Sequence, residues 1–230
     1  MDRYTIYYAL MFLGIAISSL AQLFIRTTYS KYSKEMVASG LNGAEAALTI
    51  LNSNGLSDVN VSRVNGYLSD HYSPASRQVC LSANNYSERS IAAVAVACHE
   101  CGHALQDQSN YVFMKVRSSL VPVVNFSSYA GYLAISVGLM TGLTRAVFIG
   151  VILEMVILLF QIVTLPVEID ASSRALRQIE ELNILNEEEY AKGKKVLTAA
   201  ALTYVAGVLT TLIEILRLII MLSDRRERRG

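Results

Sequence analysis

Residues 118–165 read SSLVPVVNFSSYAGYLAISVGLMTGLTRAVFIGVILEMVILLFQIVTL, and this stretch decides the fold class. It contains only two charged residues, Arg145 and Glu154. A helix needs about 20 predominantly apolar residues to span the hydrocarbon core of a bilayer, and both 118–144 and 146–165 are long enough. The few residues around Arg145 are typical of a tight turn. The stretch therefore predicts a membrane hairpin of two antiparallel helices.

Two further stretches extend this pattern towards the ends of the chain. Residues 4–25 carry no charge, and residues 196–222 carry only Glu214 and Arg217. Over the whole chain 53% of residues are hydrophobic and 17% are charged, whereas a soluble domain has about 25% charged residues. We therefore expect about four membrane spans. A cleaved signal peptide is the alternative for the first stretch, but its apolar part is long for one, so we favour an uncleaved anchor.

The first polar segment, residues 27–117, shows short periodic patterns of its own. In chain order they predict a helix at 43–51, strands near 59–64 and 77–82, and a helix from Ser87 or Ser90 to about Gln106. This segment is therefore expected to fold as a small α+β portion outside the membrane.

The second polar segment, residues 166–195, predicts two helices. Pro166 suits the first turn of a helix that covers about 167–182. Asn186, followed by three glutamates, is typical of a helix N-terminus. That second helix is expected to continue into the last apolar stretch.

Residues 99–103, HECGH, match the pattern H-E-x-x-H within the helix predicted to end near Gln106. On a helix, residues four apart lie on one face, so the rings of His99 and His103 can bind one metal ion. Glu100 lies beside that face and can take a proton from water at the metal. The alternative is a pair of hydrogen-bonded core histidines. We favour binding of one Zn²⁺, because burying two histidines and a glutamate on a helix costs free energy unless these groups have partners.

A catalytic zinc site needs a third protein ligand and an open fourth position. The chain's remaining histidine is His71, and the candidate carboxylates are Glu168 and Asp170, just past the third apolar stretch. Because two predicted spans separate the histidines from Glu168, all three lie on the same side of the membrane. Glu168 can therefore reach the metal. The alternative is that Glu168 is a carboxylate at a helix N-terminus, where the helix dipole stabilises a negative charge.

Charge and cysteine content exclude several classes of protein. The net charge of +1 and the lack of a basic cluster with aromatic residues argue against nucleic-acid binding. The three cysteines are an odd number, which argues against a disulfide scaffold. We expect Cys98 and Cys101 to pack as small apolar residues.

Charged residues within the apolar stretches need partners. Glu214 and Arg217 are three residues apart, so they can pair on one helix face. Glu154 has no partner nearby in the sequence. It either faces a wet interior of the helix bundle or has a functional role.

Several segments together resemble one family, the YugP-like neutral zinc metallopeptidases, which are bacterial membrane proteins. The resemblance covers most of the chain and rests on residues 54–56 (NGL), 68–74 (LSDHYSP), 90–103 (SIAAVAVACHECGH), 165–172 (LPVEIDAS) and 199–206 (AAALTYVA). These segments are far more specific than the five-residue motif alone.

The resemblance implies a zincin-like catalytic portion with zinc on His99, His103 and Glu168, and with Glu100 as the general base. The wider pattern is similar to heat-shock and CAAX-type membrane metalloproteases. In those proteins an Asp that supports the site follows the acidic ligand by four residues. Here Ser172 stands at that place and Asp170 lies two residues from the ligand, so both are candidates for supporting the site.

On this interpretation the chain has five segments. They are an N-terminal membrane helix at 1–26, an extramembrane catalytic region at 27–117, the membrane hairpin at 118–165, an extramembrane helix with the third metal ligand at 166–195, and a membrane helix with a basic tail at 196–230.

The predicted activity is hydrolysis of peptide bonds at zinc. His71 or Tyr72 is our candidate donor to the oxyanion, and the alternative for residues 70–74 is a turn with local hydrogen bonds. The strand at 78–82 either pairs with an extended substrate or is an ordinary strand of a sheet. Rival hypotheses are a non-catalytic membrane protein with a structural zinc, which would have His71 or Cys101 as an extra ligand, and a metal-handling membrane protein. The Glu in the motif favours the peptidase, because neither rival needs a base beside the metal.

The expected location is a bacterial cell membrane, which the chain crosses several times. The expected partners are the lipid bilayer and a peptide or membrane-protein substrate. Basic residues flank the spans on both sides, including 225–229 at one end and Lys192, Lys194 and Lys195 at the other side of the last span, so the sequence favours neither orientation.

Overall fold

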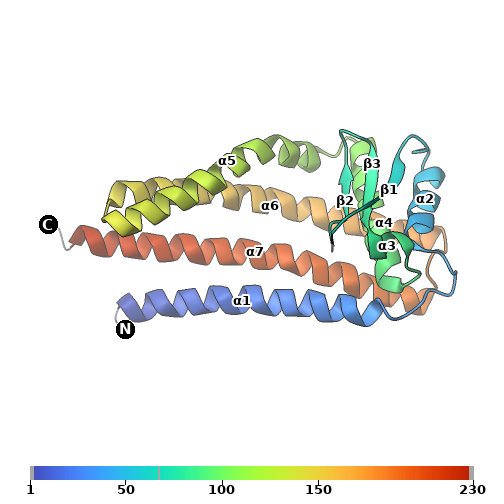
Figure 1. Cartoon of the computed structure of the whole chain (residues 1–230), viewed down its shortest axis with the longest axis horizontal. Helices are drawn as coiled ribbons and strands as arrows, with labels where there is room; N and C mark the ends of the chain where they lie inside the picture. Colours follow the sequence, from blue (N-terminus) through green and yellow to red (C-terminus); the bar gives the residue numbers. More distant parts are fainter. Residues whose placement is uncertain (1–2, 67, 228–230) are drawn as a thin grey trace. The chain divides into compact units, whose positions relative to one another are not determined.

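The computed structural model describes residues 3–66 and 68–227. The elements are α1 (Arg3–Tyr32), α2 (Gly43–Ser53), β1 (Asn60–Val64), β2 (His71–Ser73), β3 (Gln78–Ser82), α3 (Ala83–Ser87), α4 (Ile91–Gln108), α5 (Val112–Thr141), α6 (Thr144–Glu181) and α7 (Glu187–Glu227) (Figure 1). Four helices are long and apolar enough to cross a membrane, over Thr5–Tyr32, Val112–Thr141, Thr144–Glu181 and Glu187–Ser223. The predicted fold class, mainly α with four apolar spans and a small α+β portion, is confirmed.

The described residues form two compact units. The apolar unit comprises residues 3–22, 115–165 and 203–227, and it takes its residues from α1, α5, α6 and α7. The polar unit comprises residues 23–114, apart from residue 67, and 166–202. Each of α1, α6 and α7 therefore contributes one stretch to each unit.

A three-stranded sheet lies in the polar unit, in the order β1-β3-β2. β1 runs parallel to β3, and β2 runs antiparallel to it. Val79 and Leu81 of β3 are fully buried and belong to the same core as Ile50 of α2 and Val94 of α4. Because β3 is the central strand, both of its edges are already paired. The predicted pairing of residues 78–82 with a substrate is therefore wrong, and the strand is an ordinary member of the sheet.

The helix predicted to begin at Pro166 is instead the second half of one continuous helix, α6, with Pro166 inside it. A proline within a helix removes one backbone hydrogen bond. Val167, Ala171 and Ala175 follow at four-residue spacing, and all three are fully buried. Burial along this face favours the helical path through the proline, which is why the predicted boundary was wrong.

The N-terminus of α7 lies where the sequence predicts it. The Asn186 side chain accepts a hydrogen bond from the Glu189 backbone N–H, and the Glu189 carboxylate accepts one from the Asn186 N–H, both at 3.0 Å. The other Glu189 oxygen accepts a 2.6 Å hydrogen bond from the Ala38 N–H. This reciprocal cap satisfies backbone donors that a helix start leaves free, and it ties α7 to the segment after α1.

Gly102 is the point of closest approach between α4 and α6. A Cβ atom placed on Gly102 would lie 2.2 Å from the backbone oxygen of Ala171 and 2.9 Å from its carbonyl carbon. Real Cβ atoms do not approach backbone this closely, so the two helices can pack at this distance only where one residue lacks a side chain. The glycine of the HECGH motif therefore has a packing role.

We expect Gly102→Ala to force α4 and α6 apart and to lower the free energy of unfolding by about 1–3 kcal/mol, as overpacking does. Thermal unfolding followed by circular dichroism in detergent measures this change. Gly207→Ala is the matched control, because its Cβ would meet nothing closer than 3.8 Å and alanine favours a helix by about 0.5–1 kcal/mol. If the Gly102 variant is as stable as the Gly207 variant, the close approach is not a constraint.

Candidate metal centre

Helix α4 holds His99 and His103 in a fixed position. The Ser90 side chain caps the helix by accepting a hydrogen bond from the Ala93 N–H at 3.3 Å, and most of the helix is buried. The two imidazole rings lie one turn apart with their centroids 4.8 Å from each other. The helix therefore presents both rings side by side, as the spacing of the motif predicts.

Glu168 of α6 lies opposite the two rings. Its Oε2 atom is 3.3 Å from His99 Nε2 and 3.6 Å from His103 Nε2. One ligand atom from each of the three residues falls within 4.8 Å of the others. Two imidazole nitrogens and one carboxylate oxygen are a donor set that zinc takes in catalytic sites. The structure thus brings together the three residues predicted to hold the metal, and they fit a zinc ion.

The ring nitrogens that face away from Glu168 have partners of their own. His99 Nδ1 lies 3.1 Å from the Ser172 hydroxyl, and His103 Nδ1 lies 3.0 Å from Gln106 Oε1. Hydrogen bonds of this kind orient the rings of metal-binding histidines. Ser172, predicted to support the site, therefore lies against one of the two histidines.

The Gln106 amide decides which nitrogen of His103 carries the proton. Its Nε2 group donates to the Val167 carbonyl and to Asp170 Oδ2, both at 2.8 Å. Its Oε1 is therefore left to accept a hydrogen bond from His103 Nδ1–H. In this tautomer His103 Nε2 has a free lone pair, which points towards Glu168 and the metal position.

Asp170 lies one step further out in the same network. It accepts the hydrogen bond from Gln106 and a 2.6 Å hydrogen bond from Arg174 Nε. Gln106 and Arg174 were not singled out from the sequence. Gln106 lies three residues after His103 on the same helix face, and this spacing could have identified it as a partner of His103. Its partners on α6 are visible only in the tertiary structure.

Glu100, the predicted general base, is 7% exposed. Burial raises the pKa of Glu100, the imidazoles of His99 and His103 oppose this rise, and the carboxylate of Glu168 adds to it. A carboxyl group with a raised pKa is suited to accept a proton and return it. This chemistry matches the role predicted from the motif.

His71 and Tyr72 lie on β2, outside the metal-ligand group found among the described residues. His71 is exposed, and its Nδ1 lies 2.8 Å from the Ser69 carbonyl. The Tyr72 hydroxyl donates a 2.9 Å hydrogen bond to Asp107, and burial is the main cause that raises the Tyr72 pKa. A role for either residue as oxyanion donor stays a prediction.

Asp70, which precedes these two residues, holds its segment to the rest of the polar unit. Its carboxylate accepts hydrogen bonds from the Ser82 backbone N–H at 2.7 Å and from Asn85 Nδ2 at 2.8 Å. The Asn85 side-chain oxygen in turn accepts a 2.6 Å hydrogen bond from the Tyr29 hydroxyl. This chain of bonds joins α1, α3 and the loop before β2.

The three cysteines are free and buried. Burial raises the pKa of Cys98 and Cys101, so neither is disposed to form a thiolate. Cys101 Sγ faces the Ala47 carbonyl at 3.6 Å. This environment agrees with the predicted role as small packed side chains.

Comparison with known proteins points to the same chemistry. A family described as "Putative neutral zinc metallopeptidase" matches residues 7–223. A Bacillus subtilis protein named "Putative membrane protease YugP" is 43% identical over 214 residues, which cover 93% of this chain and 95% of that protein. No solved structure matches the chain. The match over nearly the whole length shows that the chain belongs to the family described as "Putative neutral zinc metallopeptidase".

Proposed function

We propose that the chain is a membrane zinc metallopeptidase that hydrolyses peptide bonds, with His99, His103 and Glu168 as zinc ligands. One observation carries the proposal: ligand atoms of these residues lie within 4.8 Å of one another, and the buried Glu100 carboxyl group lies on the same helix as the two histidines. Neither a structural site nor a transport site needs such an acid. Glu100 is therefore the feature that favours catalysis.

His99, His103 and Glu168 would hold the ion. When bound, zinc supplies a Lewis acid that polarises a carbonyl oxygen and lowers the pKa of water. Glu100 accepts the proton of the attacking water and later delivers it to the leaving amine. Because the Glu100 side chain is buried, its proton transfer is directed to the site and not to bulk solvent.

Hydrogen bonds around the site fix the orientation and the tautomer of the metal ligand His103. Gln106 keeps the proton of His103 on Nδ1, and Asp170 keeps the Gln106 amide in that orientation. Arg174 neutralises Asp170 through its 2.6 Å ion pair. Gln106, Asp170 and Arg174 would thus act as positioning residues for His103.

We infer that an extended substrate can pair with an edge strand of the described sheet close to the motif helix. β2 is at the edge of the sheet and contacts α4. An extended peptide adds to a free strand edge through backbone hydrogen bonds. We place the substrate along β2, where the predicted oxyanion donor His71 also lies.

A structural zinc would need a fourth protein ligand to close the site. Among the described residues, the ligand group contains three members, and the Cys101 thiol faces the Ala47 carbonyl instead. The lack of a fourth protein ligand near these three among the described residues supports the peptidase over the structural alternative.

Glu100→Gln should retain zinc and lose peptide cleavage by about 10²–10⁴-fold, because the amide cannot accept a proton. Casein cleavage and metal analysis of the purified, detergent-solubilised protein measure the two effects. Glu180→Gln, at an exposed position of α6, is the matched control and should cleave like the parent. Cleavage by the Glu100 variant at the parental rate would rule out the proposed base.

Glu168→Gln should lower the zinc content of the purified protein, because a neutral amide replaces the anionic ligand. Mass-spectrometric metal analysis checks this, with the same Glu180→Gln variant as control. Removing the metal with a chelator should abolish cleavage, and one equivalent of Zn²⁺ should restore it. Full zinc occupancy in the Glu168 variant would contradict its assignment as a ligand.

Gln106→Leu should weaken zinc binding by about 10–100-fold, the usual effect of losing a group that orients a metal ligand. Zinc affinity is measured by competition with a chromophoric chelator. Gln108→Leu is the matched control on the same helix, since the Gln108 side chain is exposed and donates to the Asn54 carbonyl instead. Equal affinity in the two variants would show that the Gln106 network does not position His103.

A further inference from the structure

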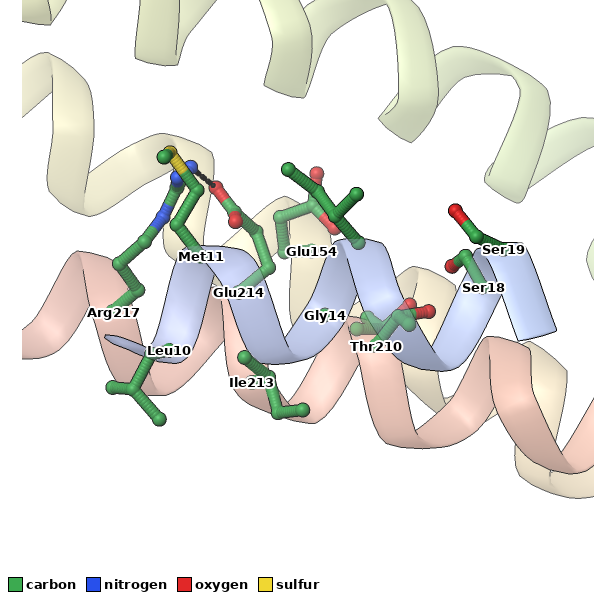
Figure 2. Close-up of a pocket in the computed structure, with 12 residues that line it drawn as sticks. Leu10, Met11, Gly14, Ser18, Ser19, Glu154, Thr210, Ile213, Glu214 and Arg217 are labelled. Atoms are coloured by element: carbon green, nitrogen blue, oxygen red, sulfur yellow. Dashed lines mark hydrogen bonds and ion pairs between the residues drawn. The ribbon is translucent and has the colours of Figure 1, made fainter. Parts of the chain in front are cut away.

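A polar pocket lies within the apolar unit, among α1, α6 and α7 (Figure 2). Its volume is about 550 Å³, which is within the usual range for ligand pockets. The polar residues that line it are Ser18 and Ser19 of α1, Glu154 of α6, and Thr210, Thr211, Glu214 and Arg217 of α7. Such a concentration of polar groups in apolar helices is costly and is usually functional.

The pocket lies at the depth of the middle of the spans. Glu154 is 8 residues from Ala146 and 11 residues from Leu165, or about 12 Å and about 17 Å along a helix. Since the hydrocarbon core is about 30 Å thick, Glu154 lies close to its midplane when α6 crosses a bilayer. The amine headgroups of lipids stay at the interface and do not reach this depth.

Among the described residues, the Glu154 carboxyl group lines the pocket without an ion-pair partner in the apolar unit. Arg217 forms an ion pair with Glu214, drawn as a dashed line in Figure 2, and lies over the Tyr7 ring at 5.0 Å. In the part of the chain that the structure describes, no side chain forms a hydrogen bond or ion pair with Glu154. The charge pattern therefore favours a cationic occupant that reaches the midplane.

We propose that this pocket binds the Lys or Arg side chain at the middle of a transmembrane helix of another membrane protein. The cation pairs with Glu154, and the hydroxyls of Ser18 and Thr210 accept its remaining hydrogen bonds. Gly14 and Ser18 lie four residues apart on α1 and line the pocket, and these small residues leave space for the cation beside Glu154.

The occupant is not a second copy of this chain. The four apolar stretches, 4–25, 118–144, 146–165 and 196–222, contain a single basic residue, Arg217, which is already paired with Glu214. The pocket also lies wholly within the apolar unit, whereas the metal-ligand residues belong to the polar unit. Helix binding and zinc chemistry can thus be tested separately.

The test uses the full chain in phosphatidylcholine vesicles and synthetic transmembrane helices of about 20 leucine and alanine residues. The helices have identical ends and differ at the central residue, which is Lys, Leu or Glu. Energy transfer between labelled protein and labelled helix measures binding. We expect the Lys helix to bind about tenfold more tightly than the Leu helix, and the Glu helix to bind no better than the Leu helix.

Glu154→Gln should remove the preference for Lys while zinc content and circular dichroism stay as in the parent. Glu187→Gln, at the exposed first turn of α7, is the matched control and should keep the preference. A Lys helix with its basic residue moved to one end should bind like the Leu helix. Equal binding of the central-Lys and Leu helices by the unmodified protein overturns the proposal without any variant, as does a preference that survives in Glu154→Gln.

Discussion

The close contact between α4 and α6 at Gly102 sets the distance between the two helices that carry the metal-ligand residues. Any side chain at Gly102 would enter the space of the Ala171 backbone, since even a Cβ atom would lie 2.2 Å from the carbonyl oxygen. At this separation the carboxylate of Glu168 lies 3.3 Å from His99 and 3.6 Å from His103. Protein interiors are close-packed and deform little. The donor set therefore depends on a glycine that ligates nothing.

A buried hydrogen-bond network joins the same two helices. The Gln106 amide on α4 donates hydrogen bonds to the Val167 carbonyl and to Asp170 on α6. Arg174 Nε donates to the same carboxylate of Asp170. A buried network is stabilising when every polar group in it has a partner, and costly when one lacks a partner. The histidine tautomer that suits a metal is thus a consequence of how the two helices pack.

The charged residues of the apolar unit are only partly paired with one another. Glu214 and Arg217 neutralise each other within one helix, as the three-residue spacing allows. Glu154 faces a pocket with hydroxyl groups and has no cation of its own among the described residues. In the polar unit the polar groups of the site are supported from within the chain, whereas in the apolar unit one group is open to a partner.

The sequence alone determined those features that depend on local spacing. Stretches without charge predicted the four apolar helices, the four-residue spacing of His99 and His103 placed both on one face, and Asn186 predicted the start of α7. Features that depend on contacts between distant segments needed the tertiary structure. Pro166 does not end a helix because the burial of Val167, Ala171 and Ala175 favours its continuation. Glu168 and Gln106 acquire their partners only when α4 and α6 pack together, since no local spacing encodes a contact between residues more than sixty positions apart.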